Sequence, residues 1–158
     1  MVVLLMGVAG AGKTTVGTRL ASELGWEFAD ADDYHPAVNV EKMRNGIPLT
    51  DEDRWPWLER LQAVITEWIR TGKSGVLACS ALKQVYRDKL MPGPAVRVVY
   101  LKGDAELFRE RLRGRSGHYM KEKMLESQLT TLEEPAGALI VDAGEPAEKV
   151  VKEILGKL

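Results

Sequence analysis

The stretch Gly7-Val-Ala-Gly-Ala-Gly-Lys-Thr14 directly follows the short apolar run Val2–Met6. A continuous apolar run of this length is typical of a strand that is covered on both faces in a parallel sheet. After the stretch, Val16, Leu20 and Leu24 recur every four residues, which predicts a helix. The glycines between strand and helix let backbone N–H groups turn toward an anion without clashes from Cβ atoms. This order of strand, glycine-rich loop and helix predicts a site for nucleotide phosphates.

The residues of this loop have distinct expected roles toward ATP. The Lys13 ammonium should reach the β- and γ-phosphate oxygens, the Thr14 hydroxyl should bind Mg²⁺, and Thr15 is the next expected phosphate contact. Backbone contacts are expected from Gly7, Gly10, Ala11 and Gly12. A chance match to this P-loop motif in such a chain is about one in a few hundred. We therefore expect ATP and Mg²⁺ as cofactors.

Four more strand patterns alternate with helical patterns along the chain. They are Trp26–Ala29, Val76–Cys79, Val96–Leu101 and Leu139–Val141. Alternation of this kind predicts a parallel sheet whose ligands gather at the carboxyl ends of the strands. We therefore expect an α/β fold of the P-loop NTPase type, with about five parallel strands flanked by helices, as a single domain over residues 1–158.

Capping residues and apolar stripes mark several helices. Thr50-Asp-Glu-Asp53 resembles a capping box at the start of one helix. Ser80 is expected to cap a helix over Ala81–Leu90, and Asp104 one over Ala105–Leu112. The helix after this capping box carries one apolar stripe, formed by Trp57, Leu61, Val64, Ile65 and Trp68. The tryptophans near this helix, Trp55, Trp57 and Trp68, belong either to the core or to a dimer surface, and we expect the core.

The overall composition limits the partners of the chain. The formal net charge is −1 and the isoelectric point is about 6.2, which argues against a general attraction to nucleic acid or anionic lipid. The single cysteine, Cys79, lies in an apolar run and has no partner for an intrachain disulfide. There is no basic leader and no apolar stretch near the length of a membrane span. We expect a cytoplasmic protein with no nucleic-acid or membrane partner.

An acidic turn follows the second expected strand. In Asp30-Ala-Asp-Asp33, Asp32 is the candidate to take the proton of an acceptor hydroxyl, and Asp30 is expected to support Mg²⁺, for example through water. The alternative is a solvated acidic turn. His35 either binds the acceptor or shapes the turn before Pro36. Ser80 stands after the third strand, where a metal-supporting carboxylate is usual.

A basic segment lies near the middle of the second half of the chain. It contains Arg109, Arg111, Arg113, Arg115, His118, Lys121 and Lys123. Together with Gly114 and Gly117, these cations predict a lid over about residues 113–123 that closes over phosphates and excludes water. The alternative is a solvated helix face followed by a loop. Arg111 and Arg115 are four residues apart and could point together at the nucleotide.

Over almost its whole length the chain resembles the gluconate kinases, a family of P-loop small-molecule kinases. The similar stretches are Gly7-Val-Ala-Gly-Ala-Gly-Lys-Thr14, Asp30-Ala-Asp-Asp-Tyr-His-Pro36, Asn39-Val-Glu-Lys-Met43, Gly46-Ile-Pro-Leu-Thr-Asp-Glu-Asp-Arg54, Trp57-Leu58, Cys79-Ser-Ala-Leu-Lys83, Tyr86-Arg-Asp88, Leu101-Lys-Gly-Asp104, Gly117-His118, Gln128 and Leu132-Glu-Glu-Pro135. The resemblance implies a cytoplasmic enzyme, commonly a homodimer, that transfers the γ-phosphate of ATP to the 6-hydroxyl of D-gluconate.

The resemblance also implies roles for single residues. Asp32 resembles the carboxylate that serves the acceptor hydroxyl. Cationic contacts to the acceptor or to the transferring phosphate are implied for Arg54, Lys83 and Arg87, and contacts to the polyol hydroxyls for His35 and Gln128. On the nucleotide side, the resemblance implies Arg111 near the adenine, Arg115 in the lid, and an adenine-contacting turn after Val141.

Other functions are consistent with the loop alone. Shikimate kinases typically have a glycine cluster after the third strand, and nucleoside monophosphate kinases an Asp-Gly-Phe-Pro-like motif; this chain contains neither a Gly-Gly pair nor that motif. A catalytically silent nucleotide-binding module would lack the side chains that bind a phosphoryl acceptor. The presence of Asp32, Arg54, Lys83 and Arg115 argues against that alternative.

Overall fold

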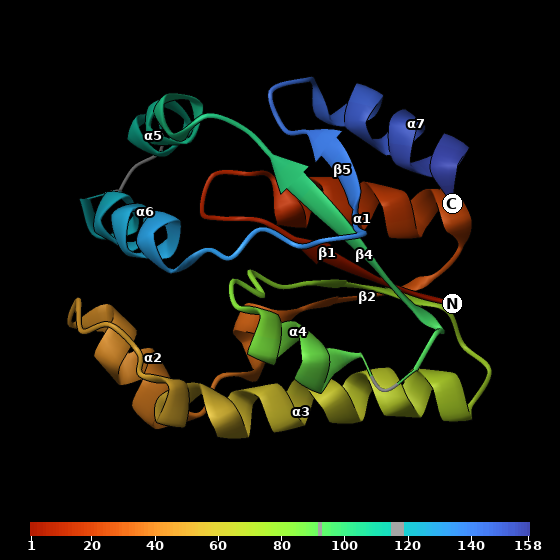
Figure 1. Cartoon of the computed structure of the whole chain (residues 1–158), viewed down its shortest axis with the longest axis horizontal. Helices are drawn as coiled ribbons and strands as arrows, with labels where there is room; N and C mark the ends of the chain where they lie inside the picture. The colour runs from red at the N-terminus through yellow and green to blue at the C-terminus, as the bar shows by residue number, and fades with distance from the viewer. Residues whose placement is uncertain (92, 115–118) are drawn as a thin grey trace.

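The computed structural model describes residues 1–91, 93–114 and 119–158. Five parallel strands form one sheet in the order β2-β3-β1-β4-β5 (Figure 1). The strands are β1 (Val2–Met6), β2 (Glu27–Asp30), β3 (Gly75–Ala78), β4 (Val96–Lys102) and β5 (Leu139–Asp142). Each overlaps its predicted position, so the prediction of a parallel five-stranded sheet is confirmed.

Helices cover both faces of this sheet, as the continuous apolar pattern of β1 requires. Helices α1 (Lys13–Leu24), α5 (Ala105–Arg113) and α7 (Ala147–Lys157) contribute to one apolar cluster, and α3 (Asp51–Arg70) and α4 (Gln84–Leu90) to the other (Figure 1). Within β1, Val3 and Leu5 belong to the first cluster, whereas Leu4 and Met6 belong to the second. All of them are fully buried, and each stabilises the fold by roughly 1.5–3 kcal/mol.

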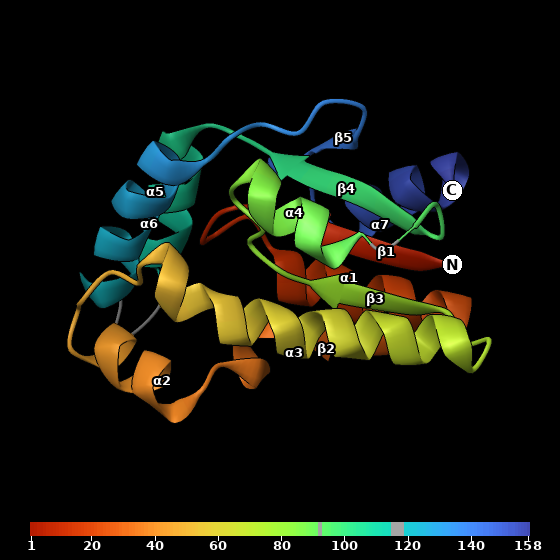
Figure 2. The ribbon, with the colours of Figure 1, turned by 60° about the horizontal axis from the view of Figure 1, so that its bottom comes forward.

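The carboxyl ends of the strands point toward the remaining helical elements. These are the short 3₁₀ helix η1 (Ala31–Tyr34), α2 (Ala37–Arg44) and α6 (Tyr119–Thr131). Figure 2 shows α2 and α6 on the left, at the same end of the molecule as the start of α3. The expected rim of the sheet is therefore enclosed by elements that come from distant parts of the sequence.

The loop after β3 differs from the prediction. Helix α4 begins at Gln84 rather than Ala81, and its N-cap is Lys83 rather than Ser80. The backbone of Ala81 has a φ of 44°, the left-handed region that L-residues rarely adopt, and this conformation excludes a helix at that point. Residues 80–83 therefore form a loop along the rim.

Other helix boundaries agree more closely with their sequence signals. Thr50 and Asp53 form the predicted capping box at the start of α3. Helix α5 begins at Ala105 as predicted, but the Asp104 side chain makes no capping hydrogen bond, which corrects that expectation. Trp57 and Trp68 lie in the core, whereas Trp55 is 41% exposed and was wrongly expected there. Cys79 is buried, as predicted.

Among the helices of the described ranges, none combines the length and the hydropathy that a membrane span requires.

Candidate active site

The glycine-rich loop connects β1 to α1 in the conformation that phosphate binding needs. Gly10 and Gly12 have φ values of 86° and 93°, which favour glycine. A Cβ on Gly10 would also lie 3.0 Å from the Phe108 carbonyl oxygen. Because α1 begins immediately after Gly12, the N–H groups of its first turn are available to an anion at this loop.

Lys13 and Thr14 lie at the start of α1. The Lys13 ammonium donates to the Val8 carbonyl oxygen at 3.1 Å. Burial lowers the pKa of Lys13, and the negative charges of Asp32 and Asp30 partly offset this effect. The Thr14 hydroxyl donates to Asp30 Oδ2 at 3.0 Å, so these two predicted metal ligands do lie together. One hydroxyl and one carboxylate fit Mg²⁺, which takes few protein ligands and completes its shell with phosphates and water.

A cavity of about 220 Å³ lies against the loop. We call it the loop cavity; its lining includes Gly10, Gly12, Lys13, Thr14, Thr15 and Asp30. A second cavity of about 350 Å³ lies between η1, the start of α3 and α6, and we call it the outer cavity. Asp32, Ser80, Met124 and Gln128 line both. A group bound in one cavity therefore meets a group bound in the other beside the Asp32 carboxylate.

Gln128 joins the outer cavity to the loop directly. Its Oε1 accepts a hydrogen bond from the Ala9 N–H at 2.6 Å, across 119 positions of sequence. This bond leaves the Gln128 side-chain NH₂ group as a donor at the boundary of the two cavities. The structure thus brings the expected acceptor residue Gln128 into contact with the phosphate-binding loop.

Among the residues that the structure describes, Arg54, near the start of α3, is the arginine that lines the outer cavity. Its guanidinium donates to the Tyr86 hydroxyl at 3.0 Å and lies 5.4 Å from the centre of the Tyr86 ring. The Tyr86 hydroxyl in turn donates to Asp51, which also accepts from Lys83 at 3.0 Å and 3.2 Å. Both Tyr86 and Asp51 are residues whose role the sequence reasoning missed.

Lys83 does not line either cavity in the described part of the chain. Its ammonium is paired with Asp51, and its pKa is raised by this hydrogen bond. The structure therefore brings Lys83 to the Arg54 network but not to the position of direct substrate contact that the resemblance implies.

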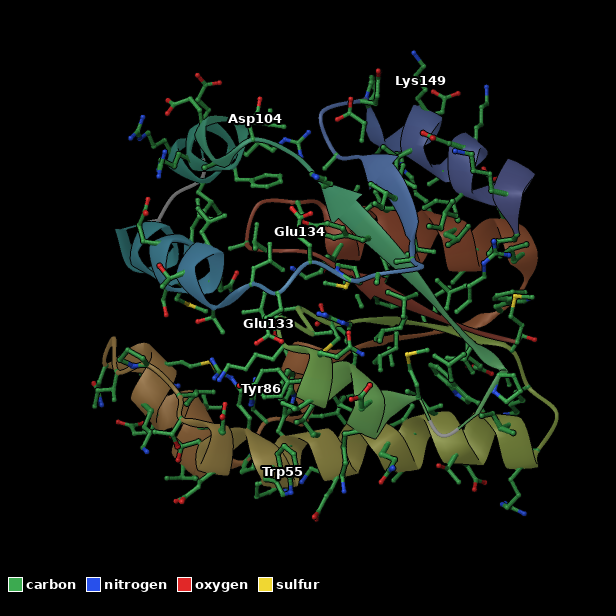
Figure 3. The ribbon with its side chains drawn as sticks, in the orientation of Figure 1. Trp55, Tyr86, Asp104, Glu133, Glu134 and Lys149 are labelled. Carbon is green, nitrogen blue, oxygen red and sulfur yellow. The ribbon has the colours of Figure 1, made fainter. Side chains whose placement is uncertain are left out.

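Arg87 is also placed differently from the expectation. It is 1% exposed and donates to the carbonyl oxygens of Ala81, Leu82 and Glu133 at 2.7, 3.2 and 2.7 Å. Figure 3 labels Glu133 on the segment after α6, beside α4. These bonds hold the strained loop after β3 against that segment. The expected contact between Arg87 and the acceptor does not agree with this placement.

His35 lines the outer cavity and stacks on Trp57, with ring centroids 4.3 Å apart and ring planes 11° apart. Burial, and then the positive charge of Arg54, lower the pKa of His35 to about 4. The ring is therefore neutral near pH 7. Its Nδ1 atom lies 3.3 Å from Nδ2 of the buried Asn39, a further residue that sequence reasoning did not assign to the site.

Arg111 lies on the other side of the loop. It donates to the Gly10 carbonyl oxygen at 3.1 Å and to the Ala143 carbonyl oxygen, which lies in the turn after β5. A cavity of about 160 Å³ opens here, lined by residues of the loop, α1 and that turn. Arg111 and the turn after Val141 are thus brought together beside the loop. Residues 115–118 of the expected lid, with Arg115 and His118, lie outside the described residues.

Taken together, a phosphate-binding loop, a second cavity that contains a few polar side chains, and an aspartate on their common wall define a P-loop kinase that acts on a small molecule. A family model described as "AAA domain" matches residues 2–135, and the chain belongs to that family of domains.

The comparisons also identify the kinase family. The thermoresistant gluconokinase of Escherichia coli (strain K12) is 44% identical over 153 residues, which cover 94% of this chain and 87% of the relative. A solved gluconokinase from Sinorhizobium meliloti 1021 has a TM-score of 0.85 and 42% identity, covering 98% of this chain and 89% of its own. A sugar kinase from Janibacter sp. HTCC2649 has a TM-score of 0.91 and 43% identity, covering 98% and 92%. The chain belongs to the gluconokinase family.

Proposed function

We propose that this protein transfers the γ-phosphoryl group of ATP to the 6-hydroxyl of D-gluconate, giving 6-phospho-D-gluconate and ADP. The observation that carries the proposal is the position of Asp32 on the wall shared by the loop cavity and the outer cavity. At this point an acceptor hydroxyl in the outer cavity would lie near both the Asp32 carboxylate and the γ-phosphate of ATP bound in the loop cavity. Membership of the gluconokinase family selects gluconate among possible acceptors.

The lining of the outer cavity suits a sugar acid in one orientation. Arg54 lines the outer cavity but not the loop cavity, so it is the natural partner of the gluconate carboxylate, which it can bind through two parallel hydrogen bonds. The C6 end then lies at Asp32. Between them, His35 and Gln128 face the polyol hydroxyls. We propose that Lys83 supports substrate binding indirectly, by balancing the charge of Asp51. Arg87 is proposed to support it by holding the loop after β3.

The chemistry follows from these positions. The 6-hydroxyl oxygen attacks the γ-phosphorus, its proton passes to the Asp32 carboxylate, and the bond to the β-phosphate oxygen breaks as ADP leaves. We propose that the Lys13 ammonium neutralises charge on the β- and γ-phosphate oxygens. Thr14 and, directly or through water, Asp30 would hold Mg²⁺, which would supply further neutralisation of the phosphate charge when bound.

The remaining parts of the nucleotide site are proposed in the same way. The cavity beside Arg111 and the turn after Val141 suits the adenine ring. A lid over about residues 113–123, with Arg115, is proposed to close over the phosphates and exclude water. We further propose a single cytoplasmic domain that forms a homodimer and has no nucleic-acid or membrane partner; the near-neutral net charge supports the last point.

An acceptor panel tests the proposal. Purified protein is incubated with MgATP and gluconate, other sugar acids, shikimate or AMP, and ADP release is followed. We expect turnover with gluconate, and 6-phosphogluconate as the product by mass spectrometry. Turnover with shikimate or AMP but not gluconate contradicts the proposal, and binding of ATP without turnover on any acceptor identifies a silent nucleotide-binding module.

A further inference from the structure

Asn39, on α2, is buried beside the outer cavity without lining it. It is 1% exposed. Its Nδ2 donates to the Asp53 backbone carbonyl oxygen at 2.8 Å and lies 3.3 Å from His35 Nδ1. Its Oδ1 has no hydrogen-bond partner among the residues that the structure describes. Leaving a buried amide oxygen without a hydrogen bond costs free energy. The orientation of the Asn39 amide must therefore be fixed by the contacts of its nitrogen.

The Asp53 carbonyl oxygen fixes that orientation. A carbonyl oxygen can only accept, so the Asn39 atom at 2.8 Å from it must be the amide nitrogen. The flipped amide would place two acceptors against each other at this distance. Lys42 helps to hold Asp53 in place, because its ammonium lies 2.9 Å from both carboxylate oxygens of the same residue. The second hydrogen of Asn39 Nδ2 therefore faces His35 Nδ1.

The orientation of Asn39 determines where His35 carries its proton. Nδ1 faces a donor and can only accept, so it has no proton, and a neutral imidazole then has its proton on Nε2. Burial and the charge of Arg54 keep the ring neutral near pH 7, since they lower its pKa to about 4. Stacking on Trp57 holds the plane of the ring. Within the described ranges, Nε2 makes no hydrogen bond and is the remaining polar atom of a side chain that lines the outer cavity.

We infer that Asn39 is a positioning residue that holds His35 as the Nε2–H tautomer, so that His35 offers an uncharged hydrogen-bond donor to a hydroxyl oxygen of the acceptor. The tautomer follows from the contacts of Asn39 alone; only the identity of the acceptor rests on the proposed function. An uncharged donor serves a polyol oxygen without attracting a second anion, which leaves the substrate carboxylate to Arg54. This role gives a physical reason for Asn39 in the Asn39-Val-Glu-Lys-Met43 stretch, one of those that resemble the gluconate kinases.

Nitrogen NMR of the intact protein tests the tautomer directly. The chain has two histidines, and the His118→Gln variant identifies which signals belong to His35. In ¹⁵N-labelled protein at neutral pH, we expect the shift of an unprotonated nitrogen at Nδ1 and of an N–H nitrogen at Nε2. A proton on Nδ1, or an averaged mixture of the two tautomers, overturns the inference. This measurement needs no substitution in the buried site and no activity.

Asn39→Leu, with Asn45→Leu at the exposed end of the same helix as the matched control, tests the positioning role. We expect mixed tautomers at His35 in Asn39→Leu and a KM for gluconate about tenfold higher, with the KM for ATP and kcat within about twofold of the parent, as loss of one hydrogen bond to the acceptor implies. An unchanged His35 spectrum in a folded Asn39→Leu protein overturns the role of Asn39. Absence of gluconate turnover in the parent protein refutes the proposed acceptor while the NMR result stands on its own.

Discussion

The Arg54 guanidinium donates a hydrogen bond of 3.0 Å to the Tyr86 hydroxyl, although the two residues are separated by 32 positions of sequence. The same hydroxyl donates to Asp51, so Tyr86 connects a cation of the outer cavity to an anion outside it. Tyr86 is 1% exposed and cannot move to other partners without disturbing the core. The direction of Arg54, and with it the proposed site for the substrate carboxylate, therefore depends on one buried phenol.

Tyr86→Phe tests this dependence. The variant keeps the ring under the guanidinium but removes the hydroxyl, so Arg54 loses one of the contacts that aim it. We expect the KM for gluconate to rise by roughly tenfold, equivalent to about 1.4 kcal/mol, with little change in the KM for ATP. Steady-state kinetics with each substrate varied in turn measures both constants.

Tyr100→Phe is the matched control for Tyr86→Phe. Tyr100 is also a buried tyrosine, at 4% exposure, but it lies on β4 and lines none of the described cavities. We expect its kinetics to equal those of the parent protein. An equal rise in both variants would mean that loss of a buried hydroxyl, and not the aim of Arg54, is responsible.

Asp32→Asn tests the proposed proton acceptor. The amide keeps the size of the side chain but is a poor base, so kcat should fall by roughly 10²–10⁴-fold while ATP binding stays nearly intact. Rapid-quench turnover and calorimetric ATP titration measure the two effects. Asp33→Asn, one residue along η1, is the control and should keep normal turnover. An unchanged rate in Asp32→Asn removes this carboxylate from the mechanism.

The features predicted from sequence are those that local patterns encode. A buried five-residue apolar run and the glycines after it are recognisable without the rest of the chain, and both β1 and the loop at Gly10 and Gly12 match their predictions. The capping box of Thr50 and Asp53 is equally local, since its partners are three residues apart. The alternation of strands and helices then predicted that Asp30 and Asp32 lie at the carboxyl ends of the parallel strands.

The features that sequence reasoning missed depend on contacts between distant segments. Tyr86 is 35 positions from Asp51, and Asn39 is 14 positions from the Asp53 carbonyl oxygen that orients it, so no periodicity marks either residue. The left-handed conformation of Ala81 has no glycine to signal it, which is why the helix after Ser80 was expected too early. The contact of Arg87 with the acceptor was implied by the resemblance, and no local pattern marks the distant Glu133 carbonyl oxygen to which Arg87 donates instead.

Lys13→Ala tests the phosphate-binding loop. Loss of the ammonium removes the cation expected at the β- and γ-phosphates, so both ATP affinity and kcat should decrease, in contrast to Asp32→Asn. Calorimetry with ATP and steady-state turnover separate these effects. Arg19→Ala removes an exposed cation from the same helix and should change neither quantity. Normal ATP affinity in Lys13→Ala would contradict the proposed position of the triphosphate.

The depressed pKa of His35 predicts a loss of stability on acidification. The folded protein holds this pKa at about 4, against about 6.5 for an ordinary histidine, because burial and Arg54 disfavour the charged ring. Between these values the unfolded chain binds more protons than the folded protein, so the free energy of unfolding decreases as the pH falls from about 6.5 to about 4. Above about pH 6.5 neither state is protonated at His35, so this loss of stability is absent there, and it is complete below about pH 4. Urea unfolding of the parent protein and of His35→Gln at pH 7.5 and 4.5 measures it, because all other titrating groups are shared. We expect a smaller loss on acidification in His35→Gln; equal losses in the two proteins would show that His35 titrates normally in the folded state.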